Sequence, residues 1–197
     1  MKHIITLLFA FISLQLVHAQ KGFNFGLAYP IGFPISNTSD YISKTSFRGF
    51  SMEFNNFIKP YLNVGVETAW NIFYERVDNK VYTEETASIS GVQYRYTNAL
   101  PIIAGAKYYK INDNSNVRPF IGVGVGTLYV DRDTDFGLYR INNDAWQFCI
   151  RPELGVAMRV PNGGAFVLSG KYFAGFEAED LEGQSYISLN IGFIFRD

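Results

Sequence analysis

Apolar and polar side chains alternate along most of the chain, and this alternation predicts strands. Between Ile121 and Thr127, branched residues alternate with glycines, a period of two that is typical of a β-strand. Stretches with this period occur eight times, each long enough to cross a bilayer as a tilted strand of ~9–11 residues. They lie at 22–33, 46–58, 61–75, 93–109, 118–130, 145–159, 165–176 and 185–195.

The connections between these strands are alternately short and long. The short ones read KP, KINDNSNV and PNGG, and the long ones span 34–45, 76–92, 131–144 and 177–184. An up-and-down barrel shows this pattern when one rim carries turns and the other carries loops. We therefore predict an all-β, antiparallel, eight-stranded barrel whose long connections share one rim.

The three glycines Gly122, Gly124 and Gly126 could belong to a phosphate-binding loop or could line a narrow lumen. A nucleotide loop needs its glycines at a turn between a strand and a helix, and no helical pattern follows here. The sequence therefore predicts lumen glycines, on a strand face that carries no side chains.

The two faces of the predicted strands differ in content. One carries large apolar residues, such as Val66, Trp70 and Leu154, and the other carries small residues with a few charges, which suit the crowded interior of an eight-stranded barrel. Rings also gather in two belts near the strand ends, as two bilayer interfaces favour. One belt contains Tyr29, Tyr74, Tyr94, Tyr129, Trp146 and Tyr186, and the other contains Tyr61, Tyr108, Tyr109, Phe193 and Phe195. The apolar face is therefore predicted to meet lipid.

Several charged residues fall on the face predicted to lie inside. These are Glu53, Glu67, Lys107, Arg118, Arg151, Glu153 and Lys171. Acids and bases are nearly balanced, as expected where buried charges must be paired to offset their desolvation. We interpret them as a plug of ion pairs that fills the barrel, with a gated pore for small ions as the alternative.

The N-terminus indicates export. Residues 1–19 combine Lys2, an apolar run over 4–17 and small residues before the predicted cut after Ala19, which is the pattern of a signal peptide. Residues 20–197 then form one barrel domain. An uncleaved anchor is the alternative, but the apolar run is shorter than the ~20 residues of a spanning helix.

The composition argues against several classes of function and of site. The chain of 197 residues has a formal net charge of -1, which gives no sign of nucleic-acid binding. Both histidines, His3 and His18, leave with the signal peptide, which excludes serine or cysteine nucleophiles paired with histidine and any His-ligated metal. Cys149 is the only cysteine, so no disulfide can form. We assign no catalytic, cofactor or metal residue and expect no enzyme.

An acidic stretch follows the fifth predicted strand. Asp131, Asp133 and Asp135 have the spacing of a calcium loop, but Gly137 is one place late and Asn142 stands where the bidentate glutamate belongs. We interpret the stretch as a solvated acidic loop. A weak divalent-cation bridge to an anionic surface glycolipid is the alternative.

The last strand, SYISLNIGFIF, ends on the aromatic residues Phe193 and Phe195 after Gly192. With FIKPYLNVGVE, ALPIIAGAKYY and RPFIGVGVGTLYV, it resembles the small outer-membrane β-barrels of the OmpA-transmembrane, OmpX and OmpW kind. The resemblance implies a porin-like transmembrane barrel whose terminal residues are read by the barrel-assembly machinery, although Arg196 and Asp197 follow the last ring. Enzymes among such barrels depend on a catalytic histidine, which the mature chain lacks.

These observations predict a monomeric outer-membrane barrel with a structural, adhesive or surface-interaction role carried by its long loops. Its expected partners are outer-membrane lipid, the assembly machinery, and a surface glycolipid or extracellular ligand. Two alternatives remain open from the sequence alone. One is a soluble lipocalin-like barrel that holds a small apolar ligand inside, and the other is a narrow pore for small solutes.

Overall fold

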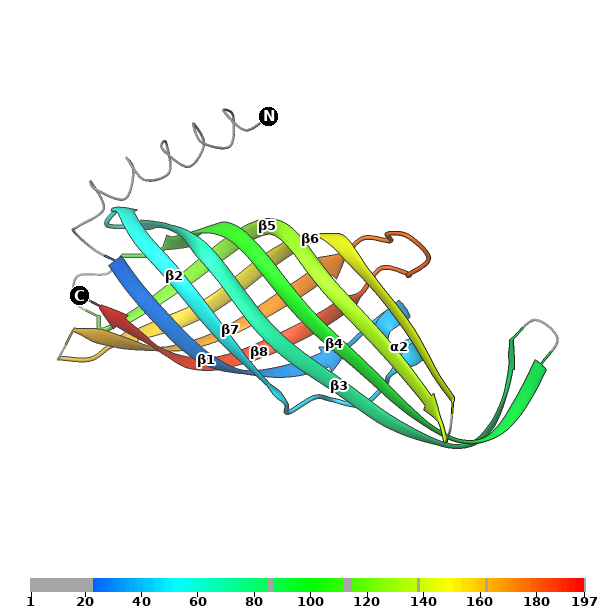
Figure 1. Cartoon of the computed structure of the whole chain (residues 1–197). Helices are drawn as coiled ribbons and strands as arrows, with labels where there is room; N and C mark the ends of the chain where they lie inside the picture. The colour runs from blue at the N-terminus through cyan, green and yellow to red at the C-terminus, as the bar shows by residue number, and fades with distance from the viewer. Residues whose placement is uncertain (1–22, 85–86, 112–114, 138, 162, 197) are drawn as a thin grey trace, which may run out of the picture.

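The computed structural model describes residues 23–84, 87–111, 115–137, 139–161 and 163–196. Eight antiparallel strands close into one barrel, in which each strand pairs with its neighbours in sequence and β8 pairs with β1 (Figure 1). The strands are β1 (Phe23–Pro34), β2 (Gly49–Lys59), β3 (Leu62–Glu84), β4 (Ala87–Tyr109), β5 (Val117–Phe136), β6 (Tyr139–Arg159), β7 (Gly164–Gly175) and β8 (Ser185–Arg196). The predicted fold class is confirmed. The signal peptide predicted at 1–19 lies outside the described residues.

Closure joins the first strand to the last over most of their length. The register runs from Asn24 opposite Arg196 to Pro34 opposite Tyr186. Closure removes the free strand edges that would otherwise invite pairing with another chain. The described chain therefore begins and ends at the same rim, together with the short turns (Figure 1).

Two of the segments predicted as loops are β-hairpins instead. β3 continues to Glu84 and β4 begins at Ala87, and together they form a two-stranded ribbon that projects beyond the barrel (Figure 1). β5 and β6 likewise continue through most of 131–144. The apolar alternation stops near Tyr74 and Tyr129, but backbone pairing does not depend on apolar side chains. The prediction of loops was wrong here because it followed the side-chain pattern alone.

The other two long connections fold back over the mouth of the barrel. The β1–β2 connection contains α2 (Asn37–Tyr41), a single turn of helix close to the end of the barrel (Figure 1).

Among the described residues no helix is long and apolar enough to cross a membrane, a test that does not bear on strands.

The large apolar side chains point outward. Ile121 is 65% exposed and Leu154 is 68% exposed, whereas the inward-facing Glu67 and Arg151 are at most 3% exposed. The predicted orientation of the two faces is confirmed. A barrel that bound an apolar ligand inside would show the opposite arrangement.

Two tyrosines assigned to the aromatic belts face the lumen instead. Tyr109 is 3% exposed and Tyr186 is 0% exposed. Neighbouring residues of a strand point to opposite faces, so Tyr108 and Ile187 take the outward positions. The corrected belts still contain Tyr29, Tyr129 and Trp146 at one end and Tyr61 and Tyr108 at the other.

Candidate functional site

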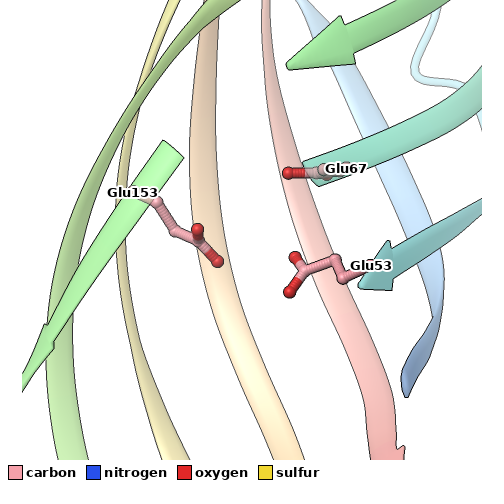
Figure 2. Close-up of side chains that lie close together, drawn as sticks. All are labelled: Glu53, Glu67 and Glu153. Atoms are coloured by element: carbon pink, nitrogen blue, oxygen red, sulfur yellow. The ribbon is translucent and has the colours of Figure 1, made fainter. Parts of the chain in front are cut away.

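Three carboxylates meet inside the barrel. Glu53 of β2, Glu67 of β3 and Glu153 of β6 point toward one another across the lumen (Figure 2), and one oxygen from each lies within 4.8 Å of the others. Glu53 and Glu67 are partners in the β2–β3 register, so strand pairing alone brings them together. Closure of the barrel brings Glu153 to them from the opposite wall.

Three cations neutralise these carboxylates. The Lys171 Nζ lies 2.6 Å from Glu53 and 2.6 Å from Glu67. The Lys107 Nζ lies 2.6 Å from Glu53 and 3.3 Å from Glu153. Arg151 places its Nε 3.1 Å from Glu67 and donates a hydrogen bond from Nη1 to Glu153. We call these six residues the charge layer, which carries no net charge.

Carboxylate triads of this kind can hold a metal ion, but this one already holds cations of the chain. The ammonium of Lys171 lies within 4 Å of all three glutamates. A divalent ion would have to displace an ammonium that is itself buried, at a large cost in desolvation. The donor set therefore fits an internal ion-pair network rather than a metal centre.

The lumen glycines give this layer its space. A Cβ at Gly122 would lie 3.1 Å from Cγ of Lys107, and a Cβ at Gly124 would lie 3.2 Å from Nη2 of Arg151. At Gly126 a Cβ would lie only 2.0 Å from the carbonyl oxygen of Ile102. All three glycines belong to the interior of β5, with no helix after them, so they form no phosphate loop.

Apolar rings close the lumen on both sides of the charge layer. Toward the long connections, Tyr186 stacks on Phe173 at 4.7 Å and meets Phe73 edge-on at 5.4 Å. Toward the short turns, Tyr109 packs against Phe57 at 5.3 Å and Phe120 at 4.9 Å. The six charges therefore lie between an upper apolar layer of Phe73, Phe173 and Tyr186 and a lower apolar layer of Phe57, Tyr109 and Phe120.

Arg118 does not join the charge layer, although it was predicted with the other six. It lies nearer the short turns, where it lines a separate cavity with Asn63 and Tyr109. Its position on β5 places it two residues before Phe120 of the lower apolar layer. Alternation assigned its side chain to the correct face but contained no information on its depth in the barrel.

The β1–β2 connection closes the mouth at the other end. Ile42 is 0% exposed and packs with the upper apolar layer. The ring of Tyr41 lies between two guanidinium groups, 5.1 Å from Arg95 and 5.0 Å from Arg132, and burial raises the pKa of Tyr41. The sequence pattern does not predict that the β1–β2 connection covers the mouth, because loop residues do not alternate regularly.

The acidic stretch at the end of β5 forms hydrogen bonds with other side chains of the same hairpin. Asn142 Nδ2 donates to Asp131 at 2.6 Å and to Asp133 at 2.8 Å, and Arg140 Nε donates to Asp133 at 2.9 Å. The hydrogen bond from Arg140 lowers the pKa of Asp133. Protein donors therefore occupy oxygens that a calcium ion would need.

The terminal residues lie where the sequence places them on β8. Phe193 and Phe195 point outward, and their ring centroids are 4.9 Å apart. A Cβ at Gly192 would lie 2.4 Å from the carbonyl oxygen of Leu27 on β1, so a glycine permits close pairing at the seam between the first and last strands. Their role as an assembly signal stays a prediction.

Comparison with solved structures finds small outer-membrane barrels. Neisserial surface protein A, NspA, matches with a TM-score of 0.56 and 14% identity, over 88% of this chain and 95% of that one. OprG of Pseudomonas aeruginosa matches with 0.53 and 14%, over 90% and 96%. Ail, the attachment invasion locus protein of Yersinia pestis, in complex with the heparin analogue sucrose octasulfate, matches with 0.52 and 12%, over 89% and 97%.

No protein-family model matches the sequence, and no curated protein matches it either. At these identities the structural likeness shows the fold alone. The chain has the fold of a small eight-stranded outer-membrane β-barrel, as the resemblance in its sequence predicts.

Proposed function

We propose that this protein is a closed barrel anchored in the outer membrane, whose projecting hairpins and loops interact with molecules at the cell surface. The observation that carries the proposal is the combination of an apolar outer wall with a filled lumen. The outer wall is suited to lipid, and the charge layer between two apolar layers supports a lumen that is blocked midway rather than an open pore.

Paired aromatic side chains support the membrane location. Tyr129 and Trp146 pack at 5.0 Å near one end of the apolar wall, and Tyr61 and Tyr108 pack at 5.6 Å near the other. Amphipathic rings favour the two interfaces of a bilayer, where the ring is half in lipid and the polar tip is in water. Beyond Tyr129 the next outward position carries Asp131, a charged residue that is only partly buried and suits contact with water.

The long connections at one rim of the barrel support a role at the cell surface. The β3–β4 ribbon projects beyond the barrel, and α2 with its flanking residues covers the mouth (Figure 1). A structural anchor alone would need only short turns at both rims. The name of the similar protein Ail refers to attachment and invasion, which makes adhesion the first surface activity to test for this chain.

The alternative functions, a soluble ligand-binding barrel, a narrow pore and an enzyme, have less support. The outward apolar face argues against a soluble barrel with an apolar ligand inside, and the filled lumen argues against a narrow pore. We propose no enzyme activity, since the three glutamates are all engaged by cations and none is poised as a general acid or base.

Electrophoretic mobility tests the barrel. Protein extracted from membranes in mild detergent is run on an SDS gel with and without boiling. We expect the unboiled band to migrate differently, because a closed membrane barrel resists SDS. Recovery in the soluble fraction, with no shift on boiling, would overturn the membrane location.

A hairpin replacement tests the surface role. Residues 79–91 are replaced by a two-residue Asn-Gly turn, which shortens the ribbon and leaves the barrel strands complete. We expect cells that display the variant to adhere less to immobilised extracellular matrix, while the gel shift is retained. The matched control is a variant in which residues 160–163, between β6 and β7 at the opposite rim, are replaced instead. Equal adhesion by all three proteins would contradict the proposal.

A further inference from the structure

A cavity of about 760 Å³ opens at the short-turn end of the lumen. Its lining includes residues from all eight strands, and the ring of Tyr109 separates it from the charge layer. This volume falls in the range of small-molecule sites, ~300–1,000 Å³. The cavity lies at the opposite end of the barrel from the surface hairpins, so it plays no part in the function proposed above.

The charged side chains that line this cavity within the described part of the chain are all cationic. Lys59, Arg118 and Arg159 line it, and no aspartate or glutamate is found among its described lining residues. In the charge layer, by contrast, three acids balance three bases. A concave site with low-dielectric walls concentrates the field of such cations and attracts anions.

Two buried polar atoms in this cavity have no hydrogen-bond partner. They are Nε of Arg118 and Oδ1 of Asn63, and Asn63 is only 2% exposed. Buried polar atoms are nearly always paired, because an unpaired one costs the desolvation of that group. One guanidinium nitrogen and one amide oxygen, both without a partner and both on side chains that line the same cavity, indicate the place of a ligand.

We propose that this cavity binds a small molecule that carries a phosphate or carboxylate group together with hydroxyl groups. Arg118 holds the anionic group, because a guanidinium presents parallel donors that match the oxygens of either anion. Asn63 bonds a hydroxyl, since an amide can both donate and accept. Lys59 attracts the ligand from the aqueous side on which the short turns lie.

Calorimetry on the full mature chain in detergent micelles tests the site with three probes: inorganic phosphate, glucose 6-phosphate and glucose. We expect glucose 6-phosphate to bind more tightly than inorganic phosphate, and glucose not to bind. In parallel, the ¹⁵N signal of the Arg118 Nε–H should shift with both anions and saturate. No shift with either anion, or equal binding of glucose and glucose 6-phosphate, would overturn the proposal.

Three variants locate the binding. Arg118→Gln removes the guanidinium, and we expect a loss of affinity of about tenfold or more, as for a charge-assisted hydrogen bond. Asn63→Asp keeps the shape but adds a negative charge, and we expect a similar loss. Lys110→Gln is the control, because Lys110 is an exposed cation near the same rim that does not line the cavity.

The gel shift on boiling reports whether each variant folds. Should Arg118→Gln fail to fold, Asn63→Asp decides the question alone. Equal weakening by Lys110→Gln and Arg118→Gln would show that the anions bind general surface charge, and it would overturn the site.

Discussion

Substitution of Arg151 should strongly destabilise the folded barrel. It contacts Glu67 and Glu153, and the side chains of all three are at most 3% exposed. Arg151→Ala would leave both carboxylates short of one cation in a place that water does not reach. Removal of one partner from a buried ion pair typically destabilises by about 3–5 kcal/mol. We expect a loss of that size in the free energy of unfolding, measured by urea titration in detergent micelles.

Arg76→Ala is the matched control for this substitution. Arg76 also pairs with an acid, Asp78, at 2.8 Å, but the two side chains are 55% and 67% exposed. Exposed ion pairs contribute about 0–1 kcal/mol. Equal unfolding midpoints for Arg76→Ala and Arg151→Ala would show that the charge layer does not stabilise the barrel.

The β5–β6 hairpin should depend on pH through Asp133. The pKa of this carboxyl is lowered, chiefly by the hydrogen bond from Arg140, so the ion pair stabilises the hairpin at a pH above the ordinary carboxyl range. That contribution is lost as the pH falls through the lowered pKa. We expect faster amide exchange at the hairpin tip in acid than at neutral pH, after correction for intrinsic rates. The same acid effect in Asp133→Asn would contradict this assignment.

At the scale of elements, the closeness of β4 to β5 rests on glycine. A Cβ at Gly126 would lie 2.0 Å from the backbone oxygen of Ile102, which cannot rotate away. Gly126→Ala therefore requires the two strands to separate, and we expect a loss of about 1–3 kcal/mol in the free energy of unfolding. Gly170→Ala is the control, because nothing lies within 4 Å of its Cβ position. Similar unfolding midpoints for the two variants would argue against a steric role of Gly126.

The sequence predicted the strands wherever their two faces differ in polarity. β5 was predicted over 118–130, where the outer face is mainly apolar and the inner face mainly small. Its extension to Phe136 was missed, because Asp131, Asp133 and Asp135 carry no apolar signal although their backbone groups remain paired. Strand pairing by backbone hydrogen bonds is not visible in a hydrophobic pattern.

The same limit explains how much of the charge layer could be predicted. Alternation assigned all seven charged residues to the inner face, and strand register then brings six of them to one level. Depth along the barrel depends on strand stagger, which the sequence does not display. Arg118 was therefore grouped with charges that lie on the far side of the ring of Phe120.

At the scale of the whole molecule, the two ends of the barrel differ. The end with the long connections is covered by Ile42 and Leu181, which pack into the upper apolar layer. The end with the short turns opens into a cationic cavity that stops at Tyr109. A solute that entered from the short-turn end would meet Tyr109 and then the charge layer, an arrangement that fits the binding site proposed above better than a pore.

This asymmetry predicts the behaviour of the protein in a planar bilayer. A permeating ion would have to pass the rings of Phe73 and Tyr186, the charge layer, and the rings of Tyr109 and Phe120. We expect no steady current, because each of the three layers closes the lumen independently. Tyr186→Ala, which opens only the upper layer, should be equally silent. A steady current whose ion selectivity changes in Glu67→Gln would show instead that ions pass through the charge layer.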